Sequence, residues 1–344
     1  MRVVLDLERF HNVGSHCLTT AIRTLFAQKG IDFQEEIILG LGSGLGFTYV
    51  RQPDGFIFGG RGGNLEANLS DSVGIRTIFR KSDNTDISWQ EKRDLILQGI
   101  PLICEADMSK LPYMVERLKT RGSGFSGHKF ILIGFDDEQE TVYVLDYLWK
   151  NVIEVKHSDF MAAINSSIKP MAPDNLSVQF DIPSRLYNFK GAVYKAIDYN
   201  VNQMKYPVGF GLGLKAEKRF FKEITCWPEI LDEEALRYEL NMAQLTFEKV
   251  GTGGGNFRRM YSRFLKTSAE ILDSEALMKA SVVYAYLGKL WKQYAKELYK
   301  ASLAEDVASE SVFSKKNEVA LEILHEEEHG IACLETYLEE MRNA

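Results

Sequence analysis

The amino-acid sequence predicts an α+β protein with two domains, a mixed domain over residues 1–170 and a mostly α-helical domain over residues 171–344. At 344 residues the chain is longer than one hydrophobic core usually supports. Strand-like apolar runs stop near Val155, and long amphipathic helices dominate the rest of the chain. We expect the connection between the domains within the proline-containing stretch 173–183.

The composition excludes several classes of protein. The net charge of -7 argues against nucleic acid as a partner. The four cysteines lie far apart and form no CxxC pair, so neither a disulfide framework nor a zinc site of that kind is predicted. The N-terminus is too charged for a signal peptide, and no apolar run approaches the length of a membrane span. We therefore expect a cytoplasmic protein without a membrane partner.

The elements of the first domain follow from their periodicity and their caps. A helix is expected from Cys17, because apolar residues recur there at helical spacing, and Gly30 is a typical left-handed stop. Ser88 with Glu91 forms a capping box at the start of another helix. The glycine-rich stretch 39–47 has no phosphate-loop pattern, and we expect it to let the backbone approach a neighbour or a ligand closely. The other expected elements are strands at 3–7, 55–58, 75–80 and within 99–105, and a helix at 65–73.

Cys17 lies in the first turn of its expected helix. Unpaired backbone N–H groups and the positive end of the helix dipole stabilise a thiolate at that position. The thiolate is the form of cysteine that attacks carbonyl carbons. The alternative is a small buried hydrophobic residue, so the interpretation of Cys17 as a nucleophile depends on a base elsewhere in the chain.

The segment 128–146 gives the clearest hairpin pattern, with two apolar runs on either side of the acidic turn 136–140. Folding it symmetrically about that turn places His128 opposite Asp146, whereas a shift of one residue would put them on opposite faces. In the symmetric register Asp146 orients the imidazole of His128, and His128 takes the proton of Cys17. This is a thiol–imidazole–carboxylate triad. The alternative for His128 is a structural histidine at the start of a strand.

The glycine-rich segment 251–255 stands out in the helical half, because it lies shortly before Arg258 and Arg259 at the start of an expected helix. Backbone N–H groups and two guanidinium groups predict a binding site for an anion such as a phosphate. The alternative is a tight turn that lets helices cross closely, with both arginines in ordinary salt bridges. The helices expected in this half span residues 217–224, 233–250, 257–272, 275–304 and 313–341.

His325 and His329 match the HExxH pattern of zinc metalloproteases. Only a short tail follows them to supply a third ligand, and glutamates crowd both flanks, as on a solvated helix face. We therefore expect no metal ion at this helix.

Two groups of residues resemble one family. The stretch 14–22 followed by 40–47 resembles the N-terminal domain of the butirosin-biosynthesis acyltransferase family. The stretch 251–258, with Tyr261 and the pair 264–265, resembles the helical domain that accompanies it. Together the two resemblances cover nearly the whole chain.

The resemblance implies a papain-like first domain in which Cys17 is the nucleophile, His128 the base and Asp146 the orienting residue. It also implies transfer of an acyl or aminoacyl group to a small-molecule amine, in antibiotic or other secondary-metabolite biosynthesis. The donor would be a thioester of an acyl carrier protein or of coenzyme A, so that phosphopantetheine arrives with the substrate and no bound cofactor is expected. Two alternatives remain. One is an enzyme, a cysteine peptidase or amidase with the same triad, and the other is a non-catalytic binding or scaffold protein.

The oxyanion and phosphate sites are the remaining expectations. The Cys17 N–H is one oxyanion donor, and papain-like enzymes add a side-chain amide upstream of the cysteine. Asn12 is the nearby amide in this chain, with His11 and His16 as other possible donors. The phosphate of the phosphopantetheine arm is expected at the anion site formed by the two arginines after the glycine-rich segment.

Overall fold

The computed structural model describes all residues except 54, 119–126, 170–171, 187, 250 and 344. It contains two compact units, residues 1–35 with 74–186 (unit 1) and residues 36–73 with 187–344 (unit 2). The boundary expected at 170/171 lies outside the described residues, and the chain passes between the units after residues 35, 73 and 186. The segment 36–73, which we expected in the first domain, belongs to unit 2 because its elements pack against helices of that unit.

Unit 1 is built on an antiparallel sheet with the strand order β4–β9–β5–β6–β7–β8, in which β1 also pairs with β6. Strand β6 is central, and each of its residues is buried. Strands β8 and β9 were not predicted from the sequence, because both are short and carry polar residues among the apolar ones. The strands span β1 (Arg2–Val4), β4 (Arg76–Arg80), β5 (Leu102–Ala106), β6 (His128–Asp136), β7 (Thr141–Leu145), β8 (Ile153–Lys156) and β9 (Ser177–Asp181).

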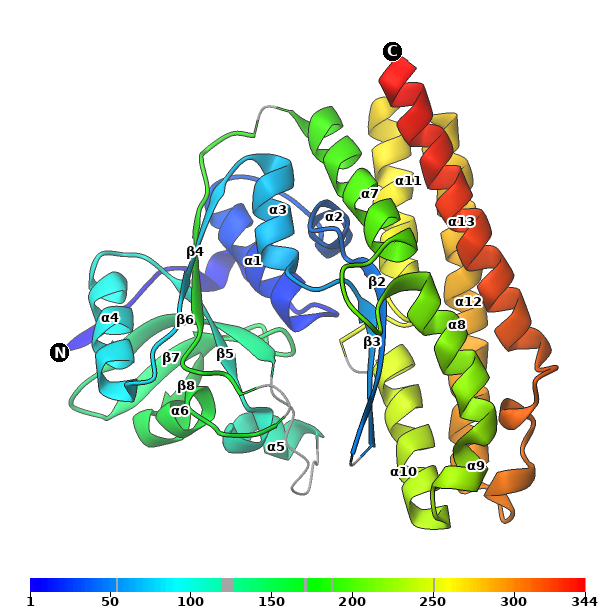
Figure 1. Ribbon diagram of the computed structural model, residues 1–344. Helices are drawn as coiled ribbons and strands as arrows, with labels where there is room; N and C mark the ends of the chain where they lie inside the picture. The colour runs from blue at the N-terminus through cyan, green and yellow to red at the C-terminus, as the bar shows by residue number, and fades with distance from the viewer. Residues whose placement is uncertain (54, 119–126, 170–171, 187, 250, 344) are drawn as a thin grey trace. The chain divides into compact units, whose positions relative to one another are not determined.

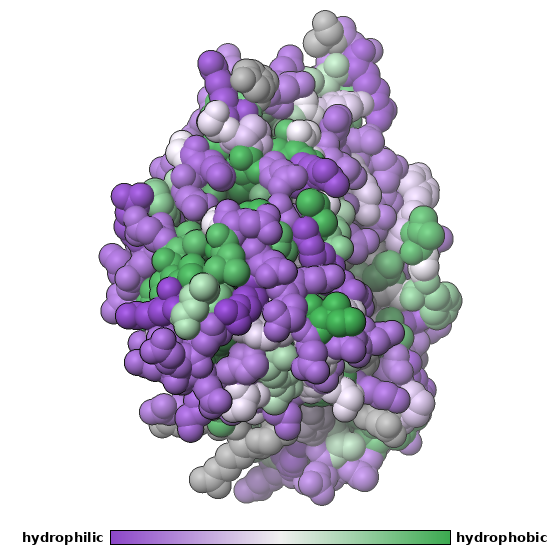
Figure 2. All heavy atoms as spheres, turned by 90° about the vertical axis from the view of Figure 1, so that its left-hand side faces the viewer, coloured by the Kyte–Doolittle hydropathy of each residue, from purple (hydrophilic) through white to green (hydrophobic). Residues whose placement is uncertain are grey.

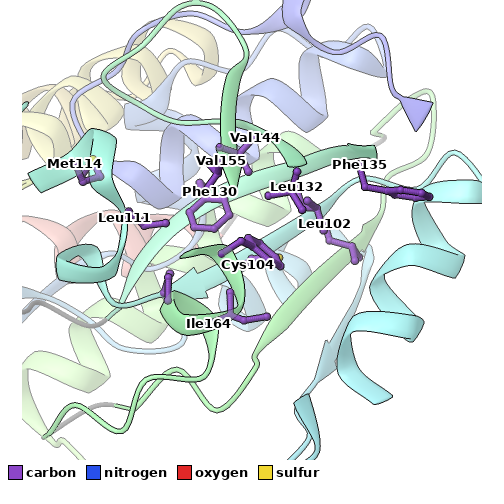
Figure 3. Close-up of a cluster of buried hydrophobic side chains, with 14 of the residues drawn as sticks. Leu102, Cys104, Leu111, Met114, Phe130, Leu132, Phe135, Val144, Val155 and Ile164 are labelled. Atoms are coloured by element: carbon purple, nitrogen blue, oxygen red, sulfur yellow. The ribbon is translucent and has the colours of Figure 1, made fainter. Parts of the chain in front are cut away.

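Helices α1 (Cys17–Gln28), α4 (Thr85–Leu97), α5 (Pro112–Leu118) and α6 (His157–Ile164) surround this sheet (Figure 1). Figure 3 shows alternate residues of β5 and β6, such as Cys104 and Phe130, in a core cluster that also includes residues of α4, α5 and α6. Helix α1 packs against β6. A helix that begins with cysteine therefore lies against an antiparallel sheet whose central strand begins with histidine.

Two predicted helix ends can be compared with the structure. Gly30 follows α1 with a φ of +78°, which confirms the left-handed stop. Helix α4 begins one turn earlier than predicted, so the capping box at Ser88 is wrong. Asn84 caps the helix instead, and its side chain accepts the N–H of Ile87 at 3.0 Å. Ser88 is buried inside the helix.

Among its described residues, unit 2 combines helices with one antiparallel hairpin, β2 (Leu45–Gln52) with β3 (Gly55–Arg61). The long helix α12 packs against α10, α11 and α13. The predicted helices of this half are present. The helix predicted at 217–224 begins earlier, as α8, and the helix predicted at 313–341 begins later, as α13. Helix α7 and strand β2 were not predicted. The helices span α2 (Glu35–Leu41), α3 (Leu65–Val73), α7 (Phe189–Lys205), α8 (Gly213–Glu223), α9 (Trp227–Ile230), α10 (Glu233–Gln244), α11 (Arg258–Leu272), α12 (Glu275–Leu303) and α13 (Glu318–Asn343).

The predicted helix 233–250 ends earlier as an α-helix, because α10 passes into a π-helical turn at Leu245–Lys249, and Val250 lies outside the described residues. The glycine-rich stretch 39–47 allows close packing, as expected. A Cβ atom at Gly40 would lie 2.0 Å from the ring of Phe264. The glycines of this stretch obscure the start of β2, which is why the sequence did not predict that strand.

The apolar residues of both units are largely buried. On the face shown in Figure 2, hydrophilic side chains predominate and hydrophobic ones form separate patches. Within the part of the chain that the structure describes, no helix combines the length and the apolar character needed to cross a bilayer.

Candidate active site

Cys17 is the first residue of α1 and is partly exposed. His16 is the N-cap, and its Nδ1 accepts the backbone N–H of Thr19 at 3.3 Å. The start of the helix thus places the thiol where the helix dipole and unpaired N–H groups favour a thiolate, as the sequence predicted.

A β-bulge brings His128 and Asp146 to the same face. The ladder between β6 and β7 shifts register by one residue at this bulge. Beyond the bulge, the last pair of the ladder is Ile131 with Leu145. The next residue of the chain, Asp146, therefore lies opposite Phe130. Phe130 and His128 are two residues apart and share a face. Without the bulge Asp146 would lie opposite Ile131 and on the other face. The predicted juxtaposition is therefore present, but it is diagonal rather than directly opposite.

Asp146 is held by three donors. The Nε2 atom of His128 lies 2.7 Å from its Oδ2 atom, and both side chains are almost fully buried. The hydroxyl of Tyr113, on α5, donates to the same oxygen at 2.8 Å, and the N–H of Tyr147 donates to Oδ1 at 2.6 Å. Sequence reasoning missed Tyr113. No local pattern connects it with Asp146, which lies well beyond it in the chain.

His128 also forms a side-chain hydrogen bond with Cys17. Because Nε2 faces Asp146, Nδ1 is the ring nitrogen left for the thiol. Burial alone would raise the pKa of the Cys17 thiol, but the hydrogen bond and charge of His128 and the backbone N–H of Lys129 lower that pKa below its ordinary value. Burial alone would lower the pKa of His128, but the charge and hydrogen bond of Asp146, together with Cys17, raise it to about 10. Geometry and charge therefore favour a thiolate–imidazolium pair.

His11 connects α1 with the segment that carries Asp146. Its Nε2 lies 3.1 Å from the Asp146 carbonyl oxygen and 2.9 Å from the Trp149 carbonyl oxygen, and its Nδ1 lies 2.9 Å from the hydroxyl of Thr24. Two carbonyl acceptors require a proton on Nε2. Burial lowers the pKa of His11, which favours the neutral ring. The ring nitrogens of His11 are thus occupied by structural bonds, and His11 does not serve as an oxyanion donor.

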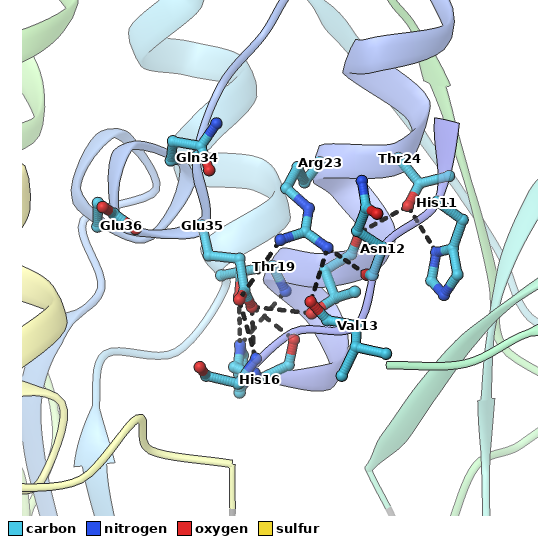
Figure 4. Close-up of polar contacts among 12 residues, drawn as sticks. His11, Asn12, Val13, His16, Thr19, Arg23, Thr24, Gln34, Glu35 and Glu36 are labelled. Atoms are coloured by element: carbon cyan, nitrogen blue, oxygen red, sulfur yellow. Dashed lines mark hydrogen bonds and ion pairs between the residues drawn. The ribbon is translucent and has the colours of Figure 1, made fainter. Parts of the chain in front are cut away.

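Asn12, the expected oxyanion amide, is exposed, and its carbonyl oxygen accepts a hydrogen bond from Arg23. In Figure 4 its side chain lies beside Arg23, away from His16 at the helix start. The N–H groups of Ser15 and His16 donate to Glu35 at 2.9 and 3.1 Å. The structure therefore gives no support to Asn12 in this role and leaves the Cys17 N–H as the candidate oxyanion donor.

The anion site predicted at Arg258 must be corrected. Arg258 is fully buried, and its Nε donates to Glu327 at 2.6 Å. Its Nη1 donates to the carbonyl oxygens of Gly46, Gly60 and Asn256 at 2.8–2.9 Å. These contacts direct the guanidinium into the core, so Arg258 cannot hold a phosphate from solution. Arg259 is partly exposed, and its function in anion binding stays a prediction.

The glycine-rich turn before α11 serves close packing. Gly255 has a φ of +63°, and a Cβ atom there would lie 2.4 Å from the carbonyl oxygen of Gly288 on α12. This agrees with the alternative that we gave for the segment, a tight turn that lets helices cross closely.

The HExxH segment lies on α13. The side chains of His325 and His329 are exposed beside Glu326, whereas Glu327 is buried against Arg258. Among the described residues, no group of three or more His, Cys, Asp and Glu side chains is arranged to hold a metal ion. The absence of metal from the protein stays a prediction.

A cavity of about 460 Å³ in unit 1 lies at the other end of α1. Gln28, Lys29, Pro101 and Phe180 are among the residues that line it, and it includes no residue of the triad. Because no group of interacting titratable side chains lines this cavity, the Cys17 region remains the candidate active site.

Comparison with known proteins identifies both parts of the chain. Residues 16–147 match the family model described as butirosin biosynthesis protein H, N-terminal, and residues 159–333, half of the chain, match a domain of unknown function, DUF4872. No curated protein shows significant sequence similarity to the chain. A crystal structure described as a putative C39-like peptidase from Bacillus anthracis is similar at 16% identity with a TM-score of 0.36, over 54% of this chain and 100% of that chain. The chain therefore belongs to the DUF4872 family, and in it that domain follows a butirosin biosynthesis protein H N-terminal domain, as the resemblance implied.

Proposed function

We propose that this chain is a cysteine-dependent acyltransferase that moves an acyl or aminoacyl group from a thioester to an amine. The observation that carries the proposal is the hydrogen-bonded series Cys17–His128–Asp146 at the start of α1. A partly exposed thiol beside a buried imidazole and carboxylate is the arrangement that nucleophilic catalysis requires.

In the first step the Cys17 thiolate attacks the thioester carbonyl. The new C–S bond to Cys17 forms while the C–S bond to the carrier breaks, and the departing thiolate takes its proton from the imidazolium of His128. One thioester replaces another, so this step costs little free energy. The Cys17 N–H faces the developing oxyanion.

In the second step an amine attacks the acyl-cysteine. Neutral His128 accepts the proton lost by the amine nitrogen, the amide bond forms and the Cys17 thiolate is released beside a protonated His128. Asp146 stabilises the imidazolium at the end of this step, as it does before the first.

The nature of the substrates is part of the proposal. An acyl carrier protein or coenzyme A thioester would supply the acyl group, and a small-molecule amine would accept it, with phosphopantetheine entering as part of the donor. The butirosin name of the matched N-terminal family favours a reaction in antibiotic biosynthesis. A cationic amine is also compatible with a chain of net charge -7.

Intact-mass measurement tests the proposal. The protein is incubated with a panel of acyl and aminoacyl thioesters of coenzyme A and pantetheine, with and without polyamine or amino-sugar acceptors. We expect the mass of an acyl group on Cys17, its discharge as an amide when an amine is added, and no adduct on the Cys17→Ala variant. Release of free acid at the same rate with and without amines would identify a hydrolase instead. No adduct and no turnover with any thioester of the panel would contradict the proposal.

A further inference from the structure

We propose that Glu35 is a positioning residue for Cys17, because its carboxylate holds the loop 14–16 in the conformation that directs the thiol at His128. The inference rests on the proposed function of Cys17, since it assigns to Glu35 a part in that reaction.

The contacts of Glu35 converge on the start of α1 (Figure 4). Its carboxylate accepts the backbone N–H groups of Ser15 and His16, the two residues directly before Cys17, at 2.9 and 3.1 Å. The hydroxyls of Thr19 and Thr20, in the first turn of α1, donate to Oε1 at 2.8 Å each. One carboxylate thus binds the residues on both sides of the nucleophile.

The loop is also closely packed at Gly14. A Cβ atom at Gly14 would lie 1.9 Å from the hydroxyl oxygen of Thr20 and 2.8 Å from a carboxylate oxygen of Glu35. The N–H of Gly14 donates to the carbonyl oxygen of Tyr147, the residue after Asp146, at 2.8 Å. The loop is therefore fixed on one side by Glu35 and on the other by the segment that carries the triad carboxylate.

Glu35 acts through position rather than through its charge. Its side chain is nine-tenths buried, and four hydrogen-bond donors and the guanidinium of Arg23, 3.7 Å away, compensate its charge. The groups that favour the Cys17 thiolate are His128 and the Lys129 N–H, and Glu35 is not among them. What Glu35 determines is the place of the loop, and a misplacement of about 1 Å in an active site can lower a rate about 100-fold.

Glutamine cannot replace Glu35 in this network. A glutamine side chain has one acceptor oxygen, and its NH₂ group can only donate. The threonine hydroxyls can rotate and accept from that NH₂ group, but the N–H groups of Ser15 and His16 can only donate. Because Ser15 and His16 donate to different oxygens of Glu35, at least one of these two N–H groups would lose its partner in a Glu35→Gln variant, and the loop would move.

The test compares Glu35→Gln with Glu36→Gln. Glu36 is the neighbouring carboxylate on α2, but it forms an ion pair with Arg263, 3.7 Å away. For each variant, thermal unfolding, the single-turnover rate of Cys17 acylation at saturating thioester, and the pH dependence of Cys17 alkylation by iodoacetamide are measured. We expect Glu35→Gln to acylate about 10- to 100-fold more slowly. Its alkylation curve should move to higher pH, because the contact with His128 loosens. Glu36→Gln should match the wild type in both.

Thr20→Val is the second variant, because it removes one donor to Glu35 at nearly constant shape. It should give a smaller change in the same direction, and it decides the question if Glu35→Gln does not fold. A folded Glu35→Gln protein, or failing that Thr20→Val, with wild-type acylation rate and alkylation curve would overturn the inference. If the wild type itself forms no acyl adduct, the proposed function fails, whereas the alkylation curves still show whether Glu35 positions the thiol.

Discussion

The two units each contain a buried group of charged side chains, and the two groups differ in their access to solvent. In unit 1 the buried pair His128–Asp146 contacts Cys17, which is partly exposed. In unit 2 the group formed by Arg258, Glu217 and Glu327 is sealed, since each of its three side chains is fully buried. Only the first group can meet a substrate.

The contacts of Arg258 explain why the motif that contains it does not give this arginine access to a ligand. A glycine-rich segment before an arginine is typical of an anion site, but the same N–H donors of Arg258 also suit main-chain carbonyl groups. In this chain they bind the carbonyl oxygens of Gly46 and Gly60, which belong to the glycine-rich hairpin segment of the same unit. The two glycine-rich motifs of the resemblance thus contact each other in the core through Arg258.

The largest expected effect is that of His128→Gln, which removes the proposed base beside Cys17 in unit 1. Acylation of Cys17 should slow about 1,000-fold, within the range typical for loss of a general acid–base residue. Single-turnover mass spectrometry with a reactive thioester measures this rate. His329→Gln, on the exposed face of α13, is the matched control and should leave the rate unchanged. A comparable loss in both variants would contradict the assignment of His128.

Arg258→Ala breaks the sealed group and should lower the free energy of unfolding by about 3–5 kcal/mol, because it leaves two buried carboxyl groups without their cation. Urea unfolding measures this loss. Arg259→Ala, at the partly exposed neighbouring position, should change stability much less. If Arg258→Ala were as stable as the wild type, the guanidinium would not be the centre of a buried ion pair.

Glu217→Gln tests the protonation of the sealed group. Burial, and then the charge of Glu327, raise the pKa of Glu217 well above 4.5 in spite of Arg258. The folded protein therefore binds this proton more tightly than the unfolded chain. The resulting stability is complete below pH 4.5 and falls by about 1.4 kcal/mol for each pH unit as the pH rises toward the folded pKa. Glutamine does not titrate, so between pH 5 and 7 the variant should gain stability relative to the wild type. Parallel stability curves would show that Glu217 is ionised in the fold.

Tyr113→Phe should have the smallest effect. It removes one hydrogen bond to Asp146, worth about 1 kcal/mol, while the bonds from His128 and the Tyr147 N–H remain. We expect Cys17 acylation to slow about fivefold in single-turnover experiments, with no change in unfolding temperature beyond a few degrees. A loss as large as that of His128→Gln would mean that the phenol acts directly on the substrate.

Local patterns in the sequence predicted the start of α1 at Cys17 and the hairpin that carries His128 and Asp146, because periodicity and turn residues are local signals. The β-bulge that sets their register was not predictable, since one extra residue in an apolar run leaves no mark in the pattern. Glu35 was missed for another reason. It lies far along the chain from Cys17, at the start of a different helix, and only tertiary structure joins them. Glu327, Gly46 and Gly60, which bind Arg258, are likewise distant from it in sequence.

The pH dependence of Cys17 alkylation tests the central claim most directly. Iodoacetamide modification of Cys17 is followed by peptide mass spectrometry from pH 4 to 11, with the exposed Cys226 in the same sample as the internal reference. The thiolate–imidazolium pair predicts that Cys17 reacts well below pH 8 and keeps a steady rate until His128 loses its proton near pH 10. The Asp146→Asn variant should move the onset to higher pH. A Cys17 curve that coincides with that of Cys226 and does not change in Asp146→Asn would contradict the account.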